Sequence, residues 1–119
     1  MRADPVERFI AYSRKREYVL LHNLPVRLYN RYFVQCRKLA RTIIDENRAE
    51  EMLPYLNGGD LFLRYSAACF FYNCFPEQCR RVLEEISEMT IPTGLPKHLV
   101  MISMSAYGNL KYGIPKDFP

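Results

Sequence analysis

Four cysteines and two histidines are the residues of this 119-residue chain whose side chains most directly suggest metal binding or nucleophile–base chemistry. Cys69, Cys74 and Cys79 recur every five residues, whereas a zinc site takes four ligands that usually come as two close pairs. The chain has no Cys-x-x-Cys pair, and neither histidine is near these cysteines in the sequence. Because free cysteine is among the most buried residue types, we interpret the cysteines as core thiols and predict no metal site and no cofactor.

Nucleophilic catalysis is the second chemistry that these residues could support. It requires a Cys or Ser close to a His that is oriented by an acid. His22 and His98 stand at the edges of expected helices, and only the fold could bring His22 to Cys36. Gly58-Gly59 precedes a helix but lacks the lysine of a phosphate-binding loop. We therefore predict that the protein is not an enzyme, and a small hydrolase built on Cys36 and His22 remains a third alternative.

A stripe of basic side chains is the strongest candidate for a functional surface. The spacing of its members places four of them on one face of a single amphipathic helix. Tyrosine beside arginine is the composition of interface hot spots. The residues are Arg27, Arg31, Lys38 and Arg41, with Arg14 and Tyr18 as outlying members. We predict that they bind an acidic surface of a partner protein; nucleic-acid binding is the alternative, and a merely solvated helix face is the simplest explanation.

The charge distribution agrees with a basic end of the molecule. Residues 1–48 carry 11 Lys/Arg against 5 Asp/Glu, whereas residues 49–90 carry 3 against 7. Such asymmetry steers oppositely charged partners. The N-terminal sequence lacks the apolar segment of a signal peptide, and no apolar run reaches the roughly 20 residues that span a bilayer. These features predict a cytoplasmic location and no membrane partner.

The stretch over residues 57–73, NGGDLFLRYSAACFFYN, is the expected centre of the fold. Asp60 can cap a helix that is apolar or small on nearly every side, and such a helix is buried. Further helices are expected near residues 4–21, 25–44, 48–56, 76–89 and 96–110, because capping residues precede apolar positions at helical spacing. No stretch alternates as a strand does. The sequence thus predicts an all-α domain over 1–119, with about six helices in three antiparallel pairs and an irregular tail over 113–119.

Local features of these helices lead to further expectations. Asn23 and Asn47 are interpreted as caps that begin the second and third helices. The run Arg14-Lys15-Arg16 is interpreted as a solvated face. The last helix carries apolar residues on more than one face, so it is either sandwiched or exposes a contact surface, which would suit a homodimer through residues 99–107.

Two resemblances add to this interpretation. Asp60-x-x-Leu63-Arg64-x-x-Ala67-Ala68 resembles the second-helix signature of a HEAT repeat, and the preceding MLPYL resembles the end of that repeat's first helix. More widely, the segments DPVERFI, LYNRYF, LPYL…LRYSAA and PEQCRRVLEEI are similar to a family of small bacterial HEAT-like helical proteins of unknown function. The resemblance implies an α-superhelix without cofactor or catalytic residues.

For single residues, the prediction assigns structural roles to the HEAT-like positions Asp60, Arg64, Ala67 and Ala68, with Arg64 bonded to a cap or to neighbouring carbonyls. Some small HEAT-like proteins resemble immunity proteins, which bind and neutralise a toxin. The chain departs from the usual pattern because it is richer in Tyr, Phe and Cys. We therefore predict a non-catalytic protein–protein interaction module, in its sharper form an immunity-type protein.

Overall fold

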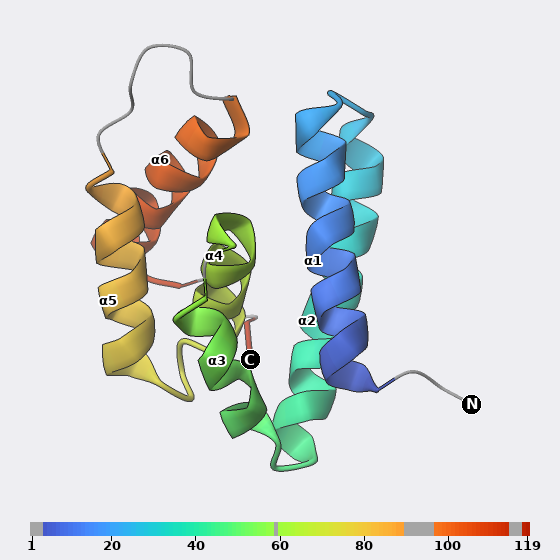
Figure 1. The fold of residues 1–119 in the computed structure, drawn as a ribbon, viewed down its shortest axis with the longest axis vertical. Helices are drawn as coiled ribbons and strands as arrows, with labels where there is room; N and C mark the ends of the chain where they lie inside the picture. The colour runs from blue at the N-terminus through green and yellow to red at the C-terminus, as the bar shows by residue number, and fades with distance from the viewer. Residues whose placement is uncertain (1–3, 59, 90–96, 115–117) are drawn as a thin grey trace.

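The computed structural model describes residues 4–58, 60–89, 97–114 and 118–119, and side chains throughout these ranges except at 97–100. Within this part of the chain every regular element is a helix, which confirms the predicted all-α class (Figure 1). The elements are α1 (Pro5–Leu21), α2 (Val26–Asp45), a 3-10 turn (Ala49–Met52), α3 (Leu53–Leu56), α4 (Leu61–Phe70), α5 (Pro76–Ser87) and α6 (Lys97–Tyr112).

The helices pack in pairs around α4. The α1–α2 hairpin lies on one side of α4, and α5 and α6 lie on the other (Figure 1). α4 contacts every other α-helix, and eight of its ten residues are buried. The central position predicted for this stretch is therefore confirmed, although the helix is shorter than the 14 residues expected.

The third helix differs from its prediction. Instead of one kinked helix, residues 49–56 form a 3-10 turn followed by the single turn of α3. Pro54 accounts for this break because proline lacks a backbone N–H and its ring collides with the carbonyl four residues earlier.

The N-terminal caps of α1 and α4 are carboxylates. Asp4 accepts a hydrogen bond from the Val6 N–H at 2.8 Å, and Asp60 accepts one from the Leu63 N–H at 3.1 Å. Both satisfy backbone donors that a helix start leaves free. Both helix starts were predicted correctly, because an Asp just before an apolar helical pattern is most often an N-terminal cap.

Asn23 and Asn47 are not the helix starts that we predicted. They have φ angles of 51° and 60° and lie just after α1 and α2. The Leu24 N–H donates back to the Val19 carbonyl at 3.0 Å, and an equivalent bond closes α2 after Asn47. This is the left-handed helix end that asparagine tolerates better than most residues. The asparagines thus end the preceding helices, and α2 begins after Pro25.

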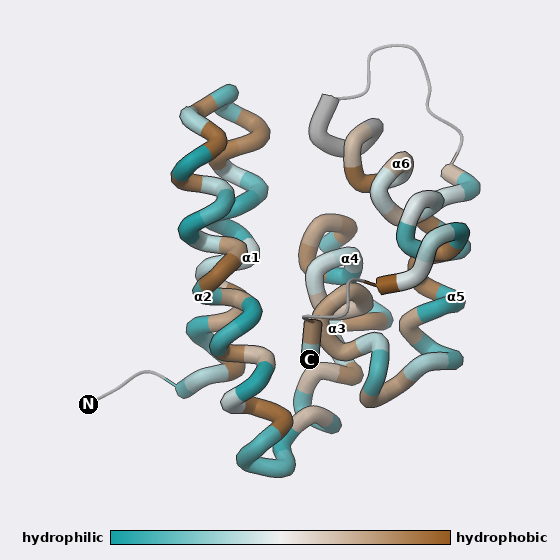
Figure 2. Tube along the Cα trace, turned by 180° about the vertical axis from the view of Figure 1, so that it is seen from behind, coloured by the Kyte–Doolittle hydropathy of each residue, from teal (hydrophilic) through white to brown (hydrophobic). Residues whose placement is uncertain are grey.

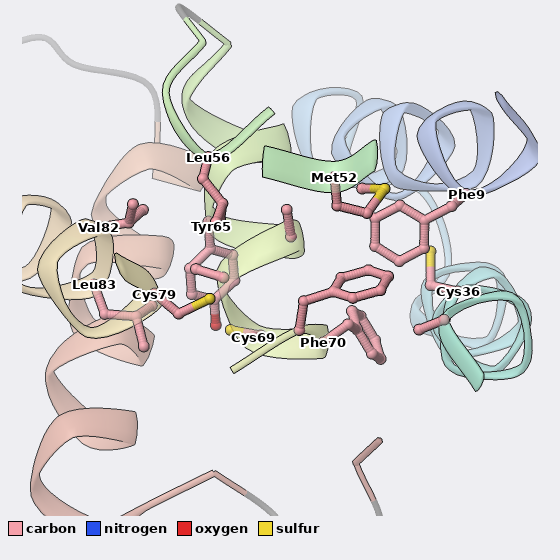
Figure 3. Packing of buried hydrophobic residues seen from close by; sticks show 14 of the residues in the cluster. Phe9, Cys36, Met52, Leu56, Tyr65, Cys69, Phe70, Cys79, Val82 and Leu83 are labelled. Carbon is pink, nitrogen blue, oxygen red and sulfur yellow. The ribbon is translucent and has the colours of Figure 1, made fainter. Parts of the chain in front are cut away.

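The core is one continuous cluster that joins both sides of α4. Figure 3 shows Phe9 of α1 beside Phe70 of α4, with Leu83 and Cys79 of α5 on the other side of α4. The rings of Phe9 and Phe70 meet edge to face, with centroids 5.7 Å apart. Along α1 and α2 hydrophilic and hydrophobic residues alternate in the manner of amphipathic helices (Figure 2), so these helices bury one side and leave the other in solvent.

Candidate protein-binding surface

The basic stripe consists of Arg27, Arg31, Lys38 and Arg41 on the outer face of α2, and all four side chains are exposed. At 1.5 Å per residue it extends about 21 Å along the helix. Arg41 lies 3.7 Å from Asp45, an exposed pair one turn away. Among the residues that the structure describes, the other three have no carboxylate partner. The stripe therefore offers at least three cations to an external acid.

The two outlying members of the predicted site lie on α1 and have different surroundings. Arg14 forms an ion pair at 3.0 Å with Asp60, the residue that caps α4. Tyr18 is exposed and packs against His22, with ring centroids 4.0 Å apart. Arg14 is thus engaged within the fold, whereas Tyr18 belongs to the exposed end of the α1–α2 hairpin.

Beside Tyr18, that end carries three exposed apolar side chains that were not predicted as part of the site, Leu21, Leu24 and Val26. The hairpin tip, which we define as Tyr18, Leu21, Leu24 and Val26, has exposed fractions between 38% and 70%. Between Tyr18 and the end of α2 the next acidic residue is Asp45, while five Lys/Arg occur in that interval. The missed signal was local: three apolar residues surround the Asn23 turn without fitting the buried face of either helix. The surface therefore combines an apolar end with a basic flank.

A hollow of about 310 Å³ lies next to the stripe and is lined by Arg37, Lys38, Arg41 and Pro119. Three of its four lining residues are cationic. A small anion or an acidic side chain would gain favourable electrostatic interactions there.

Arg16 corrects the interpretation of the Arg14-Lys15-Arg16 run as a solvated face, because only 2% of it is exposed. Its Nη1 donates to Ser66 Oγ at 3.1 Å and its Nη2 to Tyr29 Oη at 2.9 Å. Within the described structure Nε is buried without a hydrogen-bond partner. The reason is its place on α1, one turn after buried Ser13 and two turns after Phe9.

Aromatic rings take the place of a carboxylate around this buried charge. The guanidinium carbon lies 5.0 Å from the ring centroids of Tyr29 and Phe33, and within 5.6 Å of those of Phe62 and Phe70. Faces of aromatic rings attract cations, most strongly where water is excluded. Burial acts to lower the pKa of Arg16, but the facing Tyr29 and the nearby thiol outweigh it and raise that pKa above its ordinary value. Arg16 is therefore a cation at the junction of α1, α2 and α4, and we call this group the arginine cage.

Cys36 lies at the same junction and does not meet the histidine that the hydrolase alternative requires. It is fully buried, with Sγ 3.7 Å from Ser13 Oγ. Burial raises the pKa of this thiol even though Arg16 acts to lower it. His22 lies at the hairpin tip, nine residues beyond Ser13 and therefore about 13 Å from it along the axis of α1. Cys36 is therefore a buried thiol with a raised pKa, and its Sγ contacts a hydroxyl group of the core.

The remaining cysteines are also unpaired. Cys69 and Cys79 are buried and Cys74 is half-buried. Burial raises the pKa of Cys69 and of Cys79 to about 12. In the described ranges no group of three His, Cys, Asp or Glu side chains could hold a metal ion. The side chain of His98 lies outside the described residues.

The four positions to which structural roles were assigned, Asp60, Arg64, Ala67 and Ala68, lie in α4 or at its N-terminal cap. Ala67 and Ala68 are fully buried in α4. Arg64 donates through Nε to the Leu56 carbonyl at 3.0 Å and through Nη2 to Glu85 at 2.6 Å. It thereby ties the end of α3 and the side of α5 to α4.

Comparisons with protein-family models, with curated proteins and with solved structures return no match. The HEAT-like resemblance stays a prediction. The fold and the surface define an all-α protein with paired helices, a basic stripe and an apolar hairpin tip. None of the described helices combines the length and apolar character needed to cross a bilayer.

Proposed function

We propose that this protein is a non-catalytic interaction module that binds an acidic protein partner through the basic stripe and the hairpin tip. The proposal depends on one observation, which is that some arginines contact a carboxylate of this chain whereas three of the four cations of the stripe do not, over the residues that the structure describes. Arg48, Arg64 and Arg80 each contact a carboxylate within 3.0 Å, whereas Arg27, Arg31 and Lys38 project from one helix face without one in the described part of the chain. Apolar side chains next to exposed cations supply both contact area and steering.

The sharper form of this proposal is an immunity-type protein that occludes a toxin or an enzyme. It is supported by the family resemblance and by the surface chemistry, since an acidic active-site rim would match the stripe. A cytoplasmic location is part of the proposal. The four free cysteines support it, because thiols persist in a reducing compartment.

Affinity capture of tagged protein from its own cells tests this proposal. We expect one acidic protein to co-purify in stoichiometric amount with the wild type and to be lost with Arg27→Glu/Arg31→Glu. The matched control is Arg80→Glu/Arg81→Glu on α5, which makes the same charge change on another exposed surface. Helical circular dichroism of both variants should equal that of the wild type. Equal capture by all three proteins would overturn the assignment of the stripe.

Nucleic-acid binding through the same surface is a second candidate, favoured by the cationic hollow at Arg37, Lys38 and Arg41. Phosphate contacts release counterions, so affinity would fall steeply and linearly in a log–log plot against salt. Titration of a labelled single-stranded oligonucleotide over a salt series measures this. Binding that vanishes in Lys38→Glu/Arg41→Glu and shows such a slope would replace the protein-binding proposal, because an interface with an apolar centre depends less on salt.

A further inference from the structure

The eight large apolar side chains that the described structure exposes gather in two places. Four form the hairpin tip, and the other four lie on α6. The second group consists of Met101, Met104, Tyr107 and Tyr112, with exposed fractions between 51% and 80%. Helical spacing places them on one side of α6 together with Gly108 and Lys111, and we call this side the α6 outer face. A Cβ added at Gly108 would have no atom within 4 Å, so a neighbouring helix could approach closely there.

The opposite side of α6 is already used. Ile102 and Ala106 are buried against the core, with at most 2% exposed. The helix therefore has two apolar sides, one packed on the molecule and one in solvent. Single exposed hydrophobic residues are ordinary, but a contiguous apolar helix face is typical of a contact surface.

Charged residues beside this face indicate what covers it. A hollow of about 490 Å³ lies between α5 and α6 and is lined by Glu84, Ser87, Glu88, Tyr107, Leu110 and Lys111. Lys111 lies over the rings of Tyr107 and Tyr112, 5.9 and 5.5 Å from their centroids. Over the described ranges neither Lys111 nor Glu88 forms an ion pair, although both line the same hollow. The patch thus carries both charge signs around an apolar centre.

We propose that the α6 outer face binds the same face of a second copy of this chain in a two-fold symmetric dimer. In such an interface every contact occurs twice, so Lys111 of one copy meets Glu88 of the other in two equivalent places. The methionine and tyrosine side chains of each copy fill the hollow of its partner. A uniformly acidic or basic foreign partner would match only one of the two signs. The proposal is independent of the basic stripe, which lies on the other side of α4 (Figure 1).

Sedimentation velocity of the full chain over a concentration series tests the dimer. We expect a monomer–dimer equilibrium whose Kd rises by more than roughly a hundredfold in Met104→Glu, because the dimer would bury an uncompensated charge twice. Met104 is 69% exposed in the single chain, so the variant should fold. The matched control is Tyr18→Glu at the hairpin tip, 56% exposed, which should leave Kd unchanged.

A charge exchange tests the arrangement. Lys111→Glu and Glu88→Lys should each raise Kd about fivefold, and the double variant should restore it, since the pairs are remade with opposite polarity. A wild type that is monomeric at every concentration overturns the proposal. So does a dimer that Met104→Glu leaves intact or that Tyr18→Glu dissociates. Failure of the double variant to recover overturns the two-fold pairing.

Discussion

The arginine cage and the basic stripe use the same kind of side chain on paired helices and give it opposite surroundings. Arg16 of α1 is enclosed by rings and hydroxyls, whereas Arg27 and Arg31 of α2 stand in solvent. The difference follows from which helix face each residue occupies, not from the charge itself. A buried cation stabilises a fold only if its surroundings replace water, and an exposed one remains available to a partner.

The two regions also differ in what a substitution removes. In the cage one side chain joins three helices, so its loss leaves a void and unpaired hydroxyls. On the stripe each side chain contacts mainly solvent. Cations of intermediate exposure, Arg64 and Arg48, lie between these extremes. Measured free energies of unfolding for variants along this series test whether the loss of stability follows burial.

The largest effect is expected at Arg16. Arg16→Ala should lower the free energy of unfolding by about 3 kcal/mol, because it removes a large buried side chain and leaves the Tyr29 hydroxyl without its donor. Arg16→Met should cost less than about half of that, since an apolar chain of similar length refills the space. Urea denaturation measures both. Equal losses in the two variants would show that the charge, rather than the filled volume, stabilises the cage.

A smaller loss is expected at Arg64, whose side chain is 20% exposed. Arg64→Ala should lower the free energy of unfolding by about 1.5 kcal/mol, because the Leu56 carbonyl loses a charged donor. Arg80→Ala is the control. Its exposed pair with Glu84 should contribute less than about 0.5 kcal/mol. Urea unfolding curves that show the two losses to be equal would contradict a tying role for Arg64.

Arg48 forms ion pairs with Asp4 and with Glu51, and these two pairs should make the stability of the protein depend on pH. Hydrogen bonds from Arg48 lower the pKa of Asp4 and of Glu51 from their ordinary values of 3.8 and 4.5. A lowered carboxyl pKa stabilises the fold above the ordinary value and loses that contribution as pH falls through the lowered one. The melting temperature of the wild type should therefore fall more than that of Arg48→Gln between pH 6 and strongly acidic pH. Parallel profiles of the two proteins would refute this.

The smallest effect is expected on the stripe itself. Arg27→Ala/Arg31→Ala/Lys38→Ala should change the free energy of unfolding by less than about 0.5 kcal/mol, because surface substitutions away from packed features are nearly neutral. The same urea titration measures it. A larger loss would mean that the stripe is structural, and the contrast with the cage would disappear.

Several expectations from the sequence rest on local chemistry, and these hold. Asp4 and Asp60 cap helices, because a short carboxylate side chain placed just before an apolar helical pattern can accept a hydrogen bond from the first backbone N–H groups of that helix. The amphipathic spacing of α2 placed the basic stripe on its outer face, because spacing and face are linked by helix geometry alone. The uniformly apolar stretch identified α4 as the central helix for the same reason.

Other predictions were wrong at residues whose type suits two different local structures. Asparagine serves helix starts and left-handed helix ends alike, and Asn23 and Asn47 took the second role. Arginine was assigned to solvent by its charge, but Arg16 follows Ser13 and Phe9 on the buried face. Attention to that spacing would have flagged it. Leu21, Leu24 and Val26 of the hairpin tip were missed because apolar residues around a turn carry no periodic signal.

The all-α class, the order of the helices, the central position of α4 and the outward face of the stripe could be predicted from the residues alone, because each depends on spacing within one segment. Three contacts could not be predicted in this way and depend on the packing of separate helices. Arg16 lies among rings from α2 and α4, Cys36 contacts Ser13, and Arg64 joins α3 to α5. Arg16 and Phe70, for example, are 54 positions apart in the chain, and only the packing of α1 against α4 brings them together. Spacing within a helix cannot specify these contacts, because they depend on how separate helices bury their apolar faces against one another.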